Sequence, residues 1–285
     1  MHESKLIIAN IALELCSDQF YLRGMNQYRT LLPHVVEIAL GAGEKLLALY
    51  EPDNRPADRT QIFEAMRRNE NAVSSLRAEL KSTRPQATWL PDELESAPLP
   101  DGEWWVVDAV EGNINHVHGT GEWCVTITLV AGGEPVLTVV RAPIGDNTYT
   151  AIAGEGAHLG TKTLRVAEKH DLADSLALTG QAEHGQTDTH QAISQSIGAM
   201  LGQNLLVQAT VPSTFPLLAV ASGHADVFWQ YQPTLPGVAA GILLATEAGG
   251  TATRINGTPW TPGSSDILVS NTTLGAQTSN ILTRI

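Results

Sequence analysis

Two carboxylates that follow an apolar run are the groups in this sequence best placed to do chemistry. Residues 104–107 are Trp-Trp-Val-Val, and Asp108, Glu111 and Gly112 come within the next five positions. A strand that ends in this way brings two anionic oxygens to one spot, and the glycine lets the backbone approach a ligand closely. Mg²⁺ prefers such oxygen ligands and is typically held by one or two carboxylates together with substrate phosphate oxygens. The spacing therefore indicates a site for a divalent cation.

The same region could instead support acid–base chemistry without a metal. Carboxylates that cluster without a cation raise one another's pKa, which provides a neutral carboxylic acid near pH 7. The candidate acid–base residues are Asp92, Glu93, Asp108, Glu111 and His116. Together with Asn113, which follows the glycine, they form the candidate catalytic set.

Composition limits the classes of partner. The chain has 285 residues, a formal net charge of −13 and a charged fraction of 16%. This acidity argues against nucleic acid or an anionic membrane as the main partner. The two cysteines, Cys16 and Cys124, are too few for a disulfide framework, which fits a reducing, cytoplasmic location. No run approaches the roughly 20 apolar residues of a transmembrane helix, and residues 1–30 lack a signal-peptide layout.

Hydrophobic periodicity predicts an α/β protein. In the first half we expect helices over 31–50 and 69–81, a loop over 51–60, and strands over 87–90, 104–108, 123–131, 136–141 and 147–153. In the second half we expect helices over 191–201, 214–222, 238–248 and from 271, with strands over 205–209, 225–231, 251–255 and 266–270. Such alternation implies layers of helices and sheets.

Residues 108–119, Asp-Ala-Val-Glu-Gly-Asn-Ile-Asn-His-Val-His-Gly, resemble the Asp-Pro-Ile-Asp-Gly-Thr signature of the inositol monophosphatase family of Mg²⁺-dependent, lithium-sensitive phosphatases. Further segments are similar to the family in the same order: 135–143, 153–160, 221–228 and 238–250. The resemblance covers about 31–270 and implies an αβαβα layered sandwich. It also implies a domain at 31–285 with lobes at 31–165 and 166–285, after a helical N-terminal extension at 1–30.

The resemblance also assigns roles to residues. The metal ligands that it implies are Asp92, Asp108, Val110 and Glu111. The substrate-binding residues that it implies are Gly112, Asn113, Ser213, Thr214 and Gln230. Ser213 and Thr214 fall at a helix start, where backbone N–H groups favour an anion, although Ser213 could equally be a plain N-cap.

Several residues that are chemically essential in the family's motifs differ in this chain. Asn113 replaces a threonine that orients the attacking water, and Asn69 and Gly237 stand where the family has metal-binding aspartates. A two-metal displacement needs ions roughly 3.5–4 Å apart, held by bridging carboxylates. We therefore expect at most one weakly bound Mg²⁺, or none.

Three functions remain open. In the first, the protein is a pseudoenzyme that has lost the full multi-metal site and acts by binding a small-molecule ligand, phosphorylated or not, or a protein partner. In the second, it is a slow hydrolase that uses one Mg²⁺ on a small phosphorylated polyol or nucleotide. In the third, it is a metal-free acid–base enzyme. We also expect a homodimer, with the apolar residues of segment 1–24 packed on a protein surface.

Overall fold

The computed structural model describes residues 27–90, 99–181 and 186–285. Asp92 and Glu93 lie outside these ranges, and so does the helix expected within residues 1–24. Within the described ranges, no helix is long and apolar enough to cross a membrane.

Seven strands form the first sheet, in the order in which they occur along the chain. They are β1 (Thr88–Trp89), β2 (Glu103–Glu111), β3 (Cys124–Ala131), β4 (Glu134–Ala142), β5 (Asn147–Ile152), β6 (Ala157–Leu159) and β7 (Lys162–Thr163). β1 runs parallel to β2, and the other neighbours are antiparallel. The five strands expected in this half are confirmed. β3 and β4 are buried on both faces, which explains their nearly unbroken apolar sequences.

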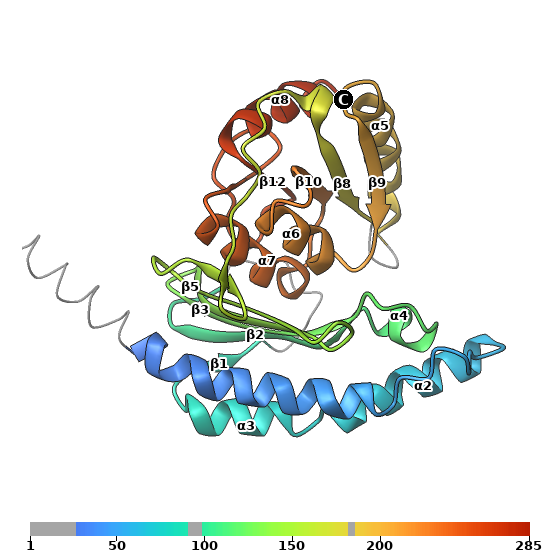
Figure 1. Ribbon diagram of the computed structural model, residues 1–285, viewed down its shortest axis with the longest axis vertical. Coiled ribbons are helices and arrows are strands. Elements are labelled where there is room, and N and C mark those ends of the chain that lie inside the picture. The colour runs from blue at the N-terminus through green and yellow to red at the C-terminus, as the bar shows by residue number, and fades with distance from the viewer. Residues whose placement is uncertain (1–26, 91–98, 182–185) are drawn as a thin grey trace, which may run out of the picture.

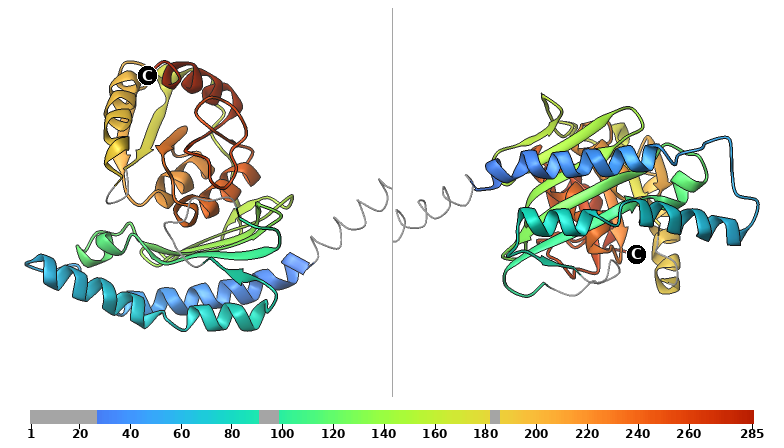
Figure 2. Two further views of the ribbon diagram at one scale, coloured as in Figure 1. Left: turned by 180° about the vertical axis from the view of Figure 1, so that it is seen from behind. Right: turned by 90° about the horizontal axis from the view of Figure 1, so that it is seen from below.

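Helices cover one face of this sheet. They are the helix at 27–47, α2 (Arg59–Ala72) and α3 (Leu76–Thr83). Figures 1 and 2 show all three beneath the sheet. Side chains such as Val35 and Leu80 pack there against Trp105, Val107 and their neighbours on the same face of the sheet.

The second sheet has the strand order β11-β12-β10-β8-β9. Its strands are β8 (Leu176–Gly180), β9 (Leu206–Thr210), β10 (Val227–Tyr231), β11 (Thr251–Thr253) and β12 (Asp266–Ser270). β8 is parallel to both of its neighbours, β9 and β10, whereas β12 is antiparallel to β10 and β11. The sheet is therefore mixed.

Four helices complete the layers: α5 (His190–Leu201), α6 (Thr214–Ala221), α7 (Leu235–Glu247) and α8 (Thr272–Leu282). α6 and α7 lie between the two sheets in Figure 1 and contribute to the largest apolar core. They pack so closely that a Cβ on Gly241 would lie 2.3 Å from Leu217 Cβ. α5 and α8 pack on the outer face of the second sheet, around Met200 and Leu274. Three apolar cores thus hold five layers together, the largest lying on both sides of α6 and α7, which confirms the αβαβα sandwich.

Two expectations about elements were wrong. The single helix expected over 69–81 is two helices, because the chain breaks at 73–75 and α2 already begins at Arg59. α2 has no apolar stripe to reveal it, since its one fully buried residue is Asn69. The strand β8, which lies between β10 and β9, was missed as well. It is a short run of five residues whose side chains are nearly all buried, so it shows no alternation that marks a strand.

Candidate functional site

The candidate site is built where β2 ends. The β2–β3 ladder shifts register between Asp108 and Glu111, and the chain then enters the short helix α4 (Asn113–Val117) through Gly112. Gly112 has a φ of 77°, and a Cβ there would lie 2.6 Å from the Glu122 carbonyl oxygen. Only glycine fits this turn, and the close approach that the structure shows is to the protein's own backbone at Glu122.

The two retained carboxylates have protein partners. Asp108 is half-buried, and its Oδ1 accepts a hydrogen bond of 2.9 Å from the backbone N–H of Val110. Glu111 is buried, and its Oε1 accepts one of 3.2 Å from the hydroxyl of Thr214 at the start of α6. The structure therefore brings Asp108, Val110, Glu111 and Thr214 together, as the resemblance implied.

Cys124 is the ladder partner of Glu111 and is fully buried. Burial raises the pKa of its thiol well above the ordinary value, and the negative charges of Glu111 and Asp108 raise it further. The thiol is therefore protonated and unreactive at neutral pH.

A neutral cluster occupies the position where the family has its upstream aspartate. Asn69 is completely buried. Its Nδ2 donates a hydrogen bond of 2.8 Å to Asn113 Oδ1 and contacts His116 Nδ1 at 3.0 Å. We call these three residues the neutral cluster. Its members come from two segments, α2 and α4, that are more than 40 positions apart.

The hydrogen-bond directions in the neutral cluster follow from its surroundings. Asn113 Nδ2 faces two acceptors, the Met66 carbonyl at 3.2 Å and Glu70 Oε1 at 3.3 Å, so Asn113 Oδ1 must be the group that faces Asn69. Asn69 then presents its NH₂ group to His116 Nδ1, which must accept. The remaining nitrogen, Nε2, carries the proton and donates to the Leu46 carbonyl at 2.9 Å.

His116 is thereby held as a neutral imidazole. Its ring is 3% exposed and lies against Tyr50 and Trp123, at centroid distances of 5.3 and 4.6 Å. Burial lowers its pKa, the Leu46 carbonyl opposes this, and the positive charge of Arg68 lowers it further. Both ring nitrogens have protein partners, so the contacts favour a structural role over the proton transfer considered from the sequence.

Ser213 and Gln230 are also brought together. The Ser213 hydroxyl donates a hydrogen bond of 2.6 Å to Gln230 Oε1, and both residues are buried. Ser213 makes no side-chain capping hydrogen bond to α6. Ser213 is therefore the N-cap residue of α6 by position, but its hydroxyl bonds to Gln230 rather than to the helix backbone. By the family resemblance, the carboxamide of Gln230 occupies the position of an acidic residue that often binds the substrate.

Gly237 lies in the first turn of α7, where the family has its other aspartate. Its carbonyl is 3.4 Å from the Thr214 hydroxyl, and a Cβ on it would lie 3.1 Å from Thr234 Oγ1. The backbone is thus positioned beside the site, but no carboxylate extends from it.

The described residues do not fit a two-ion centre. Across 27–90, 99–181 and 186–285, no group of three or more His, Cys, Asp or Glu side chains could hold a metal ion. Asp108 and Glu111 remain as oxygen ligands, Asn69 directs an N–H group into the neutral cluster, and Gly237 has no side chain. The two other expected ligand candidates, Asp92 and Glu93, lie outside the described residues.

Sequence reasoning missed how the substitutions fit together. Asn69, Asn113 and His116 were treated one by one, whereas the structure shows that each satisfies another. The partners Met66, Glu70 and Leu46 were not identified either. The available signal was that, by the family resemblance, Asn69 and Asn113 each replace an anionic or hydroxyl group by a neutral amide that can both donate and accept.

Comparisons with known proteins agree with this architecture. The model of the inositol monophosphatase family matches residues 27–284. An inositol-1-monophosphatase of Rhizobium meliloti (strain 1021) is 32% identical over 203 residues, which is 71% of this chain and 74% of the relative. The Nus factor SuhB of Xylella fastidiosa (strain Temecula1 / ATCC 700964) is 34% identical over 146 residues, which is 51% of this chain and 53% of the relative.

Solved structures show the same fold. The inositol monophosphatase from Anabaena (Nostoc) sp. PCC 7120 superposes with a TM-score of 0.78 at 24% identity, covering 92% of this chain and 98% of that one. The extragenic suppressor protein SuhB from Bartonella henselae superposes with a TM-score of 0.73 at 25% identity, covering 89% and 99%.

Proposed function

Because this chain belongs to the inositol monophosphatase family, we propose that it keeps the family's fold and cleft without the full multi-metal phosphatase site, and acts by binding. The occupant of the cleft is a small-molecule ligand or a protein partner. Mg²⁺, on which the family generally depends, would have Asp108 and Glu111 as the described carboxylates that the family resemblance assigns to it.

The neutral cluster is the observation that carries this proposal. A metal ligand must present an oxygen or a deprotonated nitrogen to the ion. Asn69 instead donates N–H groups to Asn113 and His116, and Asn113 turns its own amide nitrogen to Met66 and Glu70. The side chains that replace the ion-binding and water-orienting groups thus stabilise one another. We expect such mutual hydrogen bonding in a site that no longer binds the full set of metal ions.

The names of relatives are compatible with a role other than catalysis. One relative is named inositol-1-monophosphatase, while those from Xylella fastidiosa and Pseudomonas aeruginosa are named Nus factor SuhB. The family's fold therefore occurs under names that do not denote a phosphatase, which supports a binding role here.

A slow phosphomonoesterase with one Mg²⁺ is the second candidate, and one observation favours it. Asn69 Oδ1 is buried and accepts no hydrogen bond from the described residues. An amide oxygen is an acceptable ligand for a hard cation. Together with Asp108 and Glu111 it could contribute to a single ion site, although such a site would still lack the second ion.

Turnover separates the two candidates. Release of inorganic phosphate from inositol phosphates and from 3′-phosphoadenosine phosphates is measured with millimolar Mg²⁺. The binding proposal predicts no turnover above background. Slow turnover that is lost in Asp108→Asn would establish the second candidate instead, and rates within the ordinary enzymatic range of about 1–10³ s⁻¹ would refute both.

A further inference from the structure

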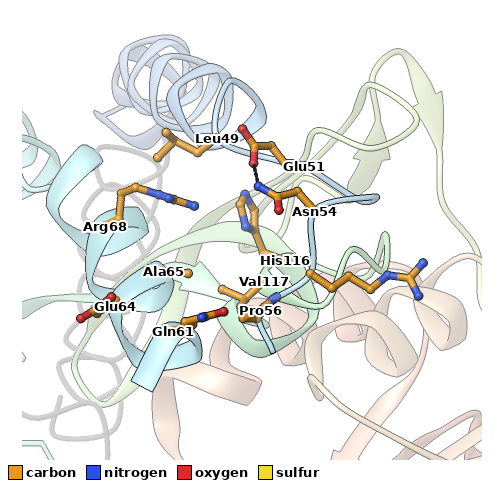
Figure 3. A pocket seen from close by; sticks show the side chains of 11 residues that line it. Leu49, Glu51, Asn54, Pro56, Gln61, Glu64, Ala65, Arg68, His116 and Val117 are labelled. Atoms are coloured by element: carbon orange, nitrogen blue, oxygen red, sulfur yellow. Dashed lines mark hydrogen bonds between the residues drawn. The ribbon is translucent and has the colours of Figure 1, made fainter. Parts of the chain in front are cut away.

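A cavity lies beside the neutral cluster and is lined in part by His116. Its volume is about 400 Å³, within the usual range of small-molecule pockets. The loop after the helix at 27–47, the helix α2 and the helix α4 enclose it. Figure 3 shows the lining side chains, which are Leu49, Glu51, Asn54, Arg55, Pro56, Gln61, Glu64, Ala65, Arg68, His116 and Val117. We call this cavity the α2 pocket. None of Asp108, Glu111, Ser213, Thr214 and Gln230 lines it.

Arg68 is the cationic group of the α2 pocket that is best placed to pair with an anionic ligand. Its guanidinium extends from α2 toward His116 in Figure 3, and its charge acts on the His116 ring. Among the described residues it makes no ion pair, not even with Glu64 one turn earlier on the same helix. A guanidinium is a planar fork of N–H donors that matches the two oxygens of a carboxylate or phosphate.

Three other polar groups of the pocket have orientations fixed by hydrogen bonds. Glu51 accepts a hydrogen bond of 2.6 Å from Asn54 Nδ2, and Gln61 Oε1 accepts one of 2.8 Å from the N–H of Ala57. Gln61 therefore keeps its NH₂ group available for a ligand. The floor is the His116 ring, which contributes a surface but no nitrogen, because both of its nitrogens serve the neutral cluster and Leu46.

We propose that the α2 pocket binds a small zwitterion whose oxyanion pairs with Arg68 and whose ammonium group lies near Glu51. The lining contains two arginines and two glutamates, so it carries no net positive charge. This balance disfavours polyanions and suits a ligand with one oxyanion and one cationic donor. The inference goes beyond the proposed function, because the ligand would contact Arg68 and Glu51 rather than Asp108 and Glu111, and it holds whether or not the site at Asp108 and Glu111 is catalytic.

Two probes distinguish the kind of oxyanion. Phosphoethanolamine offers a phosphate and an ammonium group, and β-alanine offers a carboxylate and an ammonium group. Calorimetric titration of the full-length protein should show binding of at least one of them, and the tighter one identifies the oxyanion. Binding of neither probe at about 10 mM, a concentration that detects even weak sites, would overturn the proposal.

Variants locate the binding. Arg68→Ala should weaken the bound probe about tenfold or more, because a charge-assisted hydrogen bond is lost, and Arg68→Lys should recover only part of this loss. Glu51→Gln should weaken it less. The matched control is Arg67→Ala, since Arg67 is the exposed neighbour on α2 and does not line the pocket. It should stay within about twofold of the wild type.

Arg68 is exposed, so its variants should fold normally, and an unchanged thermal midpoint confirms this. Unaltered affinity in Arg68→Ala would contradict the assignment. Loss of binding in Thr214→Ala with full binding in Arg68→Ala would place the probe in the Asp108 cleft instead, and would also contradict it.

Discussion

Replacing Asn69 by aspartate, the residue that the family resemblance implies at this position, should strongly destabilise this protein. The change removes the Nδ2 donor that serves Asn113 Oδ1 at 2.8 Å and His116 Nδ1 at 3.0 Å, and puts an oxygen in its place. The side chain is 0% exposed, so the new carboxylate has no water to solvate it. Two buried acceptors lose their donor, at about 1–3 kcal/mol each, and an unpaired buried charge costs about 3–5 kcal/mol. We expect the free energy of unfolding to fall by at least about 5 kcal/mol at pH 8, the lower end of these costs taken together.

The pH dependence of this variant should have the opposite sign to that of the wild type. In the wild type the folded-state pKa of His116 is lowered, so its contribution is fully present above the unfolded pKa of about 6.5 and is lost as pH falls through the folded pKa. In Asn69→Asp, a protonated His116 would pair with the new carboxylate, which raises the folded pKa above 6.5. That contribution is present below pH 6.5 and is lost as pH rises, so the variant should recover stability on acidification.

Chemical denaturation at pH 6 and pH 8 tests both statements. Asn71→Asp is the matched control, because Asn71 is an exposed residue near the end of the same helix and should cost no more than about 1 kcal/mol. If Asn69→Asp is as stable as the control at pH 8, or shows the wild-type pH trend, the assigned direction of the hydrogen bonds in the neutral cluster is incorrect.

The remaining predictions concern the turn, the lost ligands and assembly. Gly112→Ala should destabilise the fold by several kcal/mol, because it meets both a positive φ and the Glu122 carbonyl; a loss below about 1 kcal/mol in thermal unfolding would show that the turn can relax. Combining Asn69→Asp, Asn113→Thr and Gly237→Asp should raise phosphatase turnover far more than the three single changes do, since residues that act as a unit are not additive; additive or absent gains in the rate of phosphate release would show that other losses matter more. We also expect a homodimer in light scattering at tens of micromolar, weakened in a variant that starts at Met25; a monomeric mass for the full chain would exclude it.

The fold could be predicted from the sequence because several separate segments of the chain each carry a recognisable pattern. Apolar runs such as residues 123–131 and the ordered family-like motifs each predict one layer, and every layer buries one recognisable face. α2 was missed because its buried side is an asparagine rather than an apolar stripe, and β8 because its side chains are buried without alternation. A helix or strand whose burial depends on its tertiary neighbours cannot be predicted from the hydrophobic periodicity of its own sequence.

The candidate site could be predicted only in part, for a related reason. The types and spacing of Asp108, Glu111 and Gly112 reflect local geometry, so the sequence predicts their juxtaposition. The bonds from Asn69 to Asn113 and His116 join residues 44 and 47 positions apart, and the direction of each bond depends on backbone carbonyls that carry no sequence signal. The α2 pocket is lined largely by exposed polar residues of a loop and a helix, which by themselves read as ordinary surface.

The number of Mg²⁺ ions bound by the full-length protein tests the central claim most directly. Calorimetry at low-millimolar Mg²⁺ should detect at most one weakly bound ion per chain, and Asp108→Asn should abolish any such binding. The same titration of the triple variant with Asn69→Asp, Asn113→Thr and Gly237→Asp should increase the stoichiometry. Two or three ions bound to the wild type would contradict the account, because a complete ion site would then exist despite the neutral cluster and Gly237.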